Sequence, residues 1–222
     1  MQEAASLRGN KYIQSHHLLA AGHAGLHARY AAHIVLDLET LSTQPNAAVA
    51  SIGAAALAAD GTLLSSVHVA INDQGQGMRH IDDGTVHWWA GQSPEARAAS
   101  VDAKDGVPVG EALLFFSAWV TGVTGADAGT SDVRVYGNGS VFDNVILRTL
   151  YRDCHPLGHP EPWQWRFDRD MRTLLELYPA AKDAGEFVGI KHHAEHDALH
   201  EAKQLAKVLA ARQSVDSAVR NA

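Results

Sequence analysis

Four acidic residues and one histidine, spread over three separated segments, are the side chains best suited to chemistry in this sequence. They are Asp37, Glu39, Asp143, His192 and Asp197. Hard divalent cations such as Mg2+ and Mn2+ prefer oxygen ligands, and proteins usually bind them through a few carboxylates plus water and substrate phosphate. The set therefore indicates a two-metal site that cleaves a phosphodiester bond.

The first segment predicts a strand that presents two carboxylates together. His33 to Leu36 is a short apolar run with β-branched residues, which is typical of a buried strand. Side chains alternate along a strand, so Asp37 and Glu39 project to the same side. Two such carboxylates raise each other's pKa unless a cation lies between them. The alternative is a strand that simply runs out into a polar loop.

The second segment predicts a strand, a tight turn and a helix. Ser131–Tyr136 forms the strand, Gly137–Ser140 the turn, and Asp143 falls in the first helical turn, where the helix dipole favours a carboxylate. The alternative is structural, because Ser140 and Asp143 also have the spacing of a capping box.

The third segment predicts a long helix with Asp197 near its start. Asp197 adjoins a stripe of residues that would bury one helix face, and a carboxylate there is costly unless it is paired or binds a metal. His192 falls in the loop that enters the helix. The stripe consists of Ala198, Ala202, Leu205, Ala206 and Leu209.

A zinc site is the alternative use of this third segment. His193, His196 and His200 lie at positions i, i+3 and i+7, on one helix face. Structural zinc sites usually have four ligands, and Cys154 is the only cysteine and has no CxxC partner. The sequence therefore favours the carboxylate site.

The order and spacing of these motifs resemble the DEDDh 3′–5′ exonucleases of the ribonuclease H-like superfamily, which carry D-x-E, a central Asp and a final H-x4-D. A tyrosine four residues before the last Asp would indicate the sister DEDDy group, and His193 stands there. The sequence is most similar to the phage exodeoxyribonuclease A-like and mycobacterial polyadenylate-type exoribonuclease branch. The segments that carry this resemblance are Leu36–Leu57, Val86–Ala98, Tyr136–Arg148 and Asp168–Leu174.

The resemblance implies an α/β fold, with a ribonuclease H-like mixed sheet flanked by helices on both faces. It also implies that Asp37, Glu39, Asp143 and Asp197 bind two Mg2+ or Mn2+ ions and that neutral His192 is the general base. The expected reaction releases nucleoside 5′-monophosphates from single-stranded RNA or DNA, and the 3′-to-5′ direction comes from the resemblance alone. A homodimer is likewise expected from relatives only.

Several further residues are candidates for contact with the substrate. Trp88 and Trp89 are adjacent and cannot share one direction, so we expect one in the core and the other stacked on a base. The alternative places both in the core. Arg172 is a candidate phosphate contact. In this segment, however, arginines and aspartates alternate, which favours a salt-bridged surface (Arg166, Asp168, Arg169 and Asp170). By analogy with the family, the other candidates are Thr40, Leu41 and Asn138.

Composition limits the mode of binding. The 222 residues carry a formal net charge of −7, which is unusual for a protein that binds nucleic acid by charge alone. We therefore expect weak, metal-dependent binding to strand ends. A lone cysteine argues for a reducing, cytoplasmic setting, and no apolar run reaches the roughly 18 residues of a membrane span.

The chain is expected to form one exonuclease domain over residues 33–212, with a C-terminal tail at 213–222. Residues 1–32 form an extension of unknown role, and sequence upstream of the true start is the favoured interpretation over a targeting-like leader or an extra helix. The expected strands are His33–Asp37, Ala47–Leu57, Thr62–Ile71 and Ser131–Tyr136, with the second and third forming a hairpin. The expected helices are Asp83–Ala90, Pro94–Ser100, Val109–Val120, Phe142–Arg152, Arg172–Tyr178 and His196–Ala211.

Two questions stay open at the level of sequence. A non-catalytic protein that binds nucleic-acid ends on the same fold is the main rival, although such a protein would be expected to lack one or more of the five catalytic positions. RNA and DNA also remain equal candidates, because no residue that would recognise the 2′-hydroxyl group can be identified.

Overall fold

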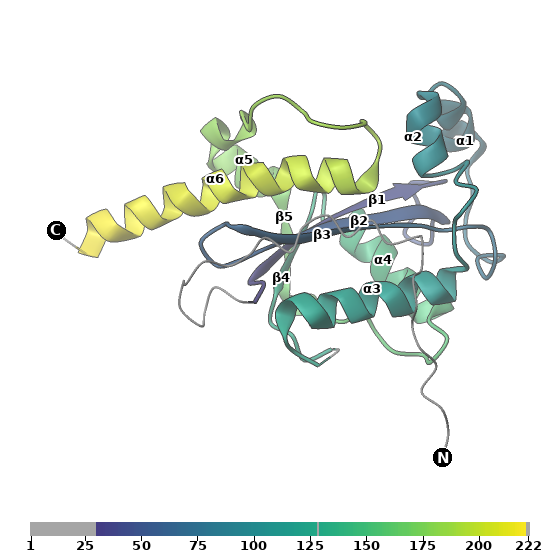
Figure 1. The fold of residues 1–222 in the computed structure, drawn as a ribbon, viewed down its shortest axis with the longest axis horizontal. Helices are drawn as coiled ribbons and strands as arrows, with labels where there is room; N and C mark the ends of the chain where they lie inside the picture. The colour runs from purple at the N-terminus through teal and green to yellow at the C-terminus, as the bar shows by residue number, and fades with distance from the viewer. Residues whose placement is uncertain (1–29, 128, 221–222) are drawn as a thin grey trace, which may run out of the picture.

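The computed structural model describes residues 30–127 and 129–220. The extension expected at residues 1–32 therefore lies almost entirely outside the described residues. The remainder of the chain forms a central sheet covered by helices (Figure 1).

The sheet has five strands and is mixed in direction. Its central strand, β1, pairs antiparallel with β2 and parallel with β4, while β2 and β3 form the expected antiparallel hairpin. In the order β3-β2-β1-β4-β5, the strands are β1 (His33–Thr40), β2 (Val49–Leu57), β3 (Leu63–Ala70), β4 (Arg134–Gly137) and β5 (Asp168–Asp170). This mixed order confirms the expected sheet.

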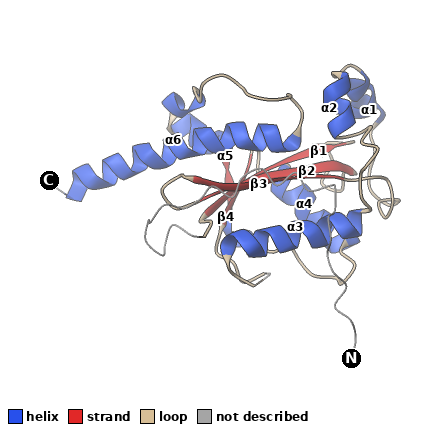
Figure 2. Cartoon of the chain, viewed as in Figure 1, coloured by secondary structure: helices blue, strands red, loops and turns tan. Residues whose placement is uncertain are grey.

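Helices cover both faces of the sheet, as expected (Figure 2). Helices α5 (Met171–Leu177) and α6 (Ala194–Arg220) lie on one face, and α3 (Val109–Thr124) and α4 (Asp143–Cys154) lie on the other. Two short helices, α1 (Asp83–Ala90) and α2 (Pro94–Ala99), lie beyond one end of the sheet. Single 3-10 turns occur at Trp165–Phe167 and Pro179–Lys182.

The alternation of β1 divides the interior into two cores. Ile34, Leu36 and Leu38 pack with α3 and α4, whereas Val35 packs with α5 and α6. Burying a large aliphatic side chain contributes about 1.5–3 kcal/mol, so this pattern strongly specifies the register of β1. Because side chains alternate along a strand, Asp37 and Glu39 project to the same face as Val35, which is the α6 face.

Strand β5 was not expected from the sequence, and it corrects the interpretation of this segment as a salt-bridged surface. Asp168 accepts hydrogen bonds from Asn144 (3.1 Å) and Trp163 (2.9 Å) and pairs with Arg148. Asp170 caps α5 through Thr173 N–H (2.8 Å). The two aspartates are thus used to fix the sheet edge and the next helix, and not to pair with the neighbouring arginines.

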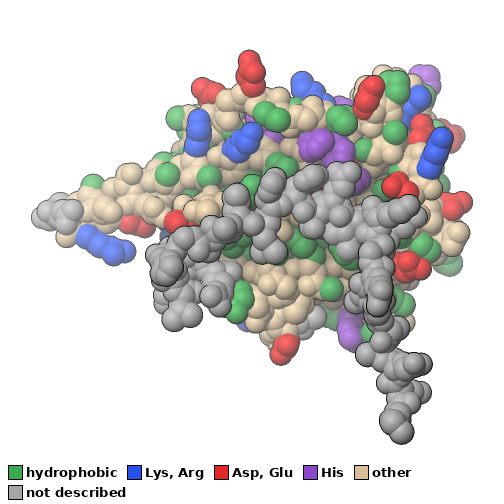
Figure 3. All heavy atoms as spheres, in the orientation of Figure 1, with side chains coloured by type: hydrophobic (Ala, Val, Ile, Leu, Met, Phe, Trp, Pro, Cys, Tyr) green, Lys and Arg blue, Asp and Glu red, His purple; other side chains and the backbone are tan. Residues whose placement is uncertain are grey.

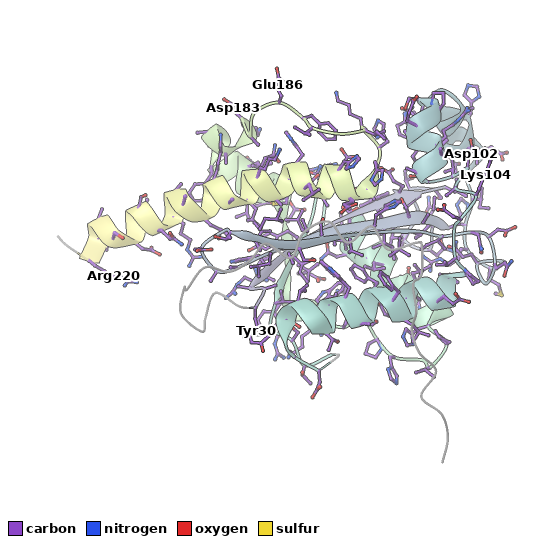
Figure 4. The ribbon with its side chains drawn as sticks, viewed as in Figure 1. Tyr30, Asp102, Lys104, Asp183, Glu186 and Arg220 are labelled. Atoms are coloured by element: carbon purple, nitrogen blue, oxygen red, sulfur yellow. The ribbon has the colours of Figure 1, made fainter. Side chains whose placement is uncertain are left out.

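Helix α6 is longer than expected, since it ends at Arg220 and not at Ala211. The expected end followed the last buried residue of the stripe, Leu209, but the following segment contains no Gly or Pro to stop a helix. Residues 211–220 are exposed, and this half of α6 extends beyond the sheet with Arg220 at its end (Figure 4).

Among residues 30–127 and 129–220, no helix is both long enough and apolar enough to cross a membrane.

Candidate active site

Helix α6 rests directly on the backbone of β2 at the position beside Asp37. Asp37 pairs in register with Gly53, and Glu39 pairs with Ser51. A Cβ atom on Gly53 would lie 2.0 Å from the carbonyl carbon of Ala194, in the first turn of α6. Residue 53 must therefore be glycine for α6 to approach so closely, and this approach brings the start of α6 to the two carboxylates of β1.

Asp143 reaches the same end of the sheet from the other side of β1. Strand β4 ends at Gly137, which pairs with Leu36, so Leu38 lies beyond the end of β4. The Leu38 N–H donates to Asp143 Oδ1 at 3.2 Å. A Cβ atom on Gly137 would lie 2.8 Å from Asp143 Cβ, so this glycine also permits a close approach.

The capping box considered for Asp143 is wrong. Helix α4 begins at Asp143 itself, its N-cap is Phe142, and that cap makes no side-chain hydrogen bond. The Ser140 N–H donates to Asp170 Oδ2 at 2.7 Å. The Asp143 carboxylate is consequently directed to β1 and not back to its own helix.

The loop before α6 holds His192 in an unusual backbone conformation. Its φ of 62° is left-handed, which costs a residue other than glycine about 1–3 kcal/mol and is often found at functional sites. The His192 N–H donates to Asp197 Oδ2 at 2.8 Å, and its ring meets the Trp88 ring edge-on with 4.9 Å between centroids. The first contact fixes the backbone of His192, and the second holds its imidazole beside Trp88.

Three ligand atoms from separate segments converge at this point. One atom each of Glu39, His192 and Asp197 lies within 4.8 Å of the other two. Glu39 is buried, and His192 and Asp197 are half-buried. A carboxylate pair with an imidazole suits a divalent cation, and Asp37 and Asp143 border the same place.

Burial makes the charged forms of these carboxylates unfavourable. It raises the pKa of Glu39 to about 8 and the pKa of Asp143 to about 7, although the Leu38 N–H acts in the opposite direction on Asp143. Burial also raises the pKa of Asp37 well above its usual range, with the charges of Asp143 and Glu39 adding to it. The pKa of Asp197 is raised by burial as well. A bound divalent cation would stabilise the ionised forms.

Glu201 is a fifth carboxylate of this region, buried like Glu39 and Asp143, that sequence reasoning missed. It lies on α6, and burial, followed by the charges of Asp143 and Asp197, raises its pKa to about 8. Its position four residues after Asp197, within the buried stripe of α6, was the signal that could have identified it.

Sequence comparison decides the family. A family model described as the 3′-5′ exoribonuclease Rv2179c-like domain matches residues 32–209, which is most of the chain. The chain belongs to the Rv2179c-like 3′-5′ exoribonuclease family. No curated protein matches it in sequence.

Two solved structures share the ribonuclease H-like fold of this chain. Pop2p of S. pombe, in a form with Mg2+ and Mn2+ bound, aligns with a TM-score of 0.54 at 11% identity, covering 80% of this chain and 82% of Pop2p. The RNase domain of the yeast Pop2 protein aligns with a TM-score of 0.50 at 10% identity, covering 84% of this chain and 79% of that domain. At such identities the likeness concerns the fold alone.

The two adjacent tryptophans have different environments. Trp89 is 2% exposed and its indole N–H donates to the Thr40 carbonyl oxygen at 2.9 Å, whereas Trp88 is 45% exposed and lies beside His192. The alternative in which both pack in the core is therefore wrong. Contact between Trp88 and a base stays a prediction, and Trp89 instead supports the end of β1.

Other residues predicted to contact the substrate lie around the same site. The buried Thr40 hydroxyl donates to the Ser42 carbonyl oxygen, and Leu41 pairs with Ala48 through its backbone N–H. Arg172 is exposed, and its Nε donates to Asn138 Oδ1 at 3.3 Å. Their contacts in this structure are with the protein itself, so their roles toward a nucleotide stay predictions.

Two of the three histidines considered for zinc, His193 and His196, stack on each other, whereas His200 lies beside Phe187. The rings of His193 and His196 lie 4.0 Å apart at 20°, and His68 lies 4.2 Å from His193. Histidine side chains gather near the start of α6 in Figure 3. Stacked rings do not direct their nitrogens to one point, and among the described residues the convergent group is Glu39, His192 and Asp197. The geometry therefore favours the carboxylate site over zinc.

A pocket of about 430 Å³ opens beside His192. Its walls come from the start of α2, with Gln92, Ser93 and Glu95, and from the loop residues Ile190 and Lys191. This volume lies within the usual range of small-ligand sites, and the walls offer hydrogen-bond donors and acceptors.

Proposed function

We propose that this chain is a metal-dependent 3′–5′ exonuclease of the DEDDh type that hydrolyses single-stranded RNA to nucleoside 5′-monophosphates. The observation that carries the proposal is the convergence of Glu39, His192 and Asp197 within 4.8 Å. Membership of the Rv2179c-like family supports the exoribonuclease activity.

Four carboxylates would hold two Mg2+ or Mn2+ ions in this proposal. They are Asp37, Glu39, Asp143 and Asp197, and the donor set fits because burial disfavours their charged forms until a cation is bound. The S. pombe Pop2p structure with Mg2+ and Mn2+ supports metal binding by this fold. Bound divalent ions would activate water and stabilise the negative charge that develops on the phosphate oxygens.

His192 would act as the general base. Its imidazole takes the proton of the attacking water, the oxygen of that water bonds to phosphorus, and the bond from phosphorus to the 3′-oxygen of the preceding nucleotide breaks. That 3′-oxygen takes a proton from solvent water and leaves as a hydroxyl group. Histidine is the side chain that enzymes most often use as a general base. The contacts of His192 with Asp197 and Trp88 support it, because a base must be held in place.

Single-stranded 3′ ends are the proposed substrate. Trp88 is exposed beside His192 and would stack on a base, and the pocket beside His192 would receive the terminal nucleotide. The net charge of −7 supports contacts with a strand end in preference to a long duplex. RNA is proposed over DNA because the matching family consists of exoribonucleases.

The test is a denaturing-gel time course on 5′-labelled single-stranded RNA and DNA of equal sequence, with Mg2+, Mn2+ or EDTA. We expect a metal-dependent ladder that shortens from the 3′ end, faster on RNA, and its loss in the Asp143→Asn variant. A faster ladder on DNA would refute the RNA preference. Intact binding without cleavage would refute the exonuclease and favour the non-catalytic end-binding protein.

A further inference from the structure

Glu201 lies one helical turn beyond Asp197 on α6. Residues four apart share a helix face, so both carboxylates are directed to the sheet. Glu201 is only 7% exposed, whereas a glutamate on a helix surface is normally solvated. Burying a carboxylate costs free energy that burying an aliphatic side chain at this position of α6 would not cost. A carboxylate retained here therefore indicates a function.

The surroundings of Glu201 are acidic. Asp143 and Asp197 are the acidic groups whose charges act on Glu201, and the charge of Glu201 in turn acts on Asp37. Three of the four proposed metal ligands are therefore its neighbours. A fifth carboxylate among them adds repulsion, which only a cation or a proton can offset.

One oxygen of Glu201 has no hydrogen-bond partner. Within the described part of the chain, Oε2 is fully buried and unpaired. A buried polar atom left unpaired costs about 1–3 kcal/mol, so native proteins usually pair such atoms with protein groups or ordered water. Asp143 and Asp197 are the acidic neighbours of this carboxylate, so its unpaired oxygen lies in the neighbourhood of the proposed metal centre.

Two residues that were predicted to contact the substrate, Asn138 and Arg172, are neighbours of Glu201. The Asn138 side chain acts to lower the pKa of Glu201 and so favours its ionised form, and Arg172 Nε donates to Asn138 Oδ1 at 3.3 Å. The guanidinium also lies near Asp143 and Glu201 and favours their ionised forms. Arg172 and Asn138 thus act on carboxylates of the protein itself.

We propose that Glu201 is a fifth carboxylate of the metal centre that binds a cation through a water molecule. The proposed function assigns the direct ligands to Asp37, Glu39, Asp143 and Asp197, and Glu201 does not belong to the group of ligand atoms that converge within 4.8 Å, so we place it in the outer coordination sphere. Outer-sphere partners of this kind orient metal-bound water and strengthen binding. The inference rests on the metal centre of the proposed function.

The test is the binding of Mn2+ alone to the full chain, measured by calorimetry for the wild type and three variants. We expect Glu201→Gln to weaken the binding of at least one ion by about 10-fold or more. Glu195→Gln is the matched control, because Glu195 is buried on the same helix and accepts a hydrogen bond from the Ser66 hydroxyl (2.6 Å), which glutamine can also accept. Asp143→Asn changes one of the proposed direct ligands and should lose Mn2+ affinity.

Thermal melting in EDTA separates this role from a structural one. Glu201→Gln should melt at or above the wild-type temperature, since it removes a charge from a crowded acidic site. A melting temperature well below that of the wild type would show a structural role and overturn the inference. Wild-type Mn2+ affinity in Glu201→Gln, with affinity lost in Asp143→Asn, would overturn it and leave the proposed function intact. A wild type that binds no Mn2+ would overturn both.

Discussion

Individual residues of the site have conformations or environments that cost free energy. His192 has a left-handed backbone, and Glu39 and Asp143 are buried carboxylates with raised pKa values. Proteins tolerate such groups mainly at functional sites, because the rest of the fold must supply the stability that they cost. This pattern supports a catalytic role over a merely structural one.

The first residue-scale prediction concerns His192. His192→Ala should lower the rate of RNA hydrolysis by about 10²–10⁴-fold, because a positioned general base contributes that much. The measurement is single-turnover cleavage at saturating Mg2+. His200→Ala is the control and should retain near wild-type activity, since His200 lies farther along α6 beside Phe187. A larger loss in His200→Ala than in His192→Ala would instead favour the zinc alternative.

The two tryptophans give a second residue-scale prediction. Trp88→Ala should raise KM for RNA by roughly 5- to 150-fold, the equivalent of about 1–3 kcal/mol of stacking, with little change in stability. Trp89→Ala should lower the free energy of unfolding by about 3–5 kcal/mol, because its side chain is buried and bonded to Thr40. Urea unfolding and steady-state kinetics distinguish the two variants, and equal effects would contradict the assignment.

At the scale of elements, the site forms where β1, β4, α4 and α6 meet. Strand β1 runs past the end of β4, which leaves the Leu38 N–H for Asp143 to bind. Helix α6 reaches Asp37 and Glu39 only because Gly53 has no side chain. Ligands of α/β proteins commonly bind at such strand ends, where backbone groups and helix starts come together.

Gly53 therefore carries the element-scale prediction. Gly53→Ala should displace the first turn of α6, lower both activity and Mn2+ affinity, and cost about 1–3 kcal/mol of stability through overpacking. Gly122→Ala is the matched control, because a Cβ there meets nothing within 4 Å in helix α3. The control should be neutral or stabilising by about 0.5–1 kcal/mol. Wild-type Mn2+ affinity in Gly53→Ala would refute this account of how α6 is positioned.

At the scale of the whole molecule, the buried acids should make stability depend on pH and metal. Glu39 and Glu201 have folded-state pKa values of about 8, and that of Asp143 is about 7, all above their unfolded values. The folded state thus binds more protons than the unfolded state, and stability falls as pH rises through the folded pKa.

The fall in stability caused by these carboxylates should be measured between pH 7 and pH 9. Burial lowers the pKa of His33 and His68 to about 4 and helps lower that of His193 to about 3, so these residues reduce stability only as pH falls below about 6.5. In EDTA the melting temperature should fall from pH 7 to pH 9, and Mg2+ should remove most of this fall because it stabilises the ionised carboxylates. A melting temperature that rises over this range in EDTA would contradict the prediction.

Local spacing by itself determined the central strand and predicted the residues of the site. The alternation of β1 predicts two apolar faces and the shared direction of Asp37 and Glu39, because the two-residue period of a strand is a local property. The D-x-E, Asp and H-x4-D spacing indicated the family for the same reason. Only the tertiary structure decided the bond from Leu38 to Asp143, the contact of His68 with His193, strand β5 and the place of Glu201. Each of these depends on contacts between segments far apart in the chain, where packing outweighs local propensity.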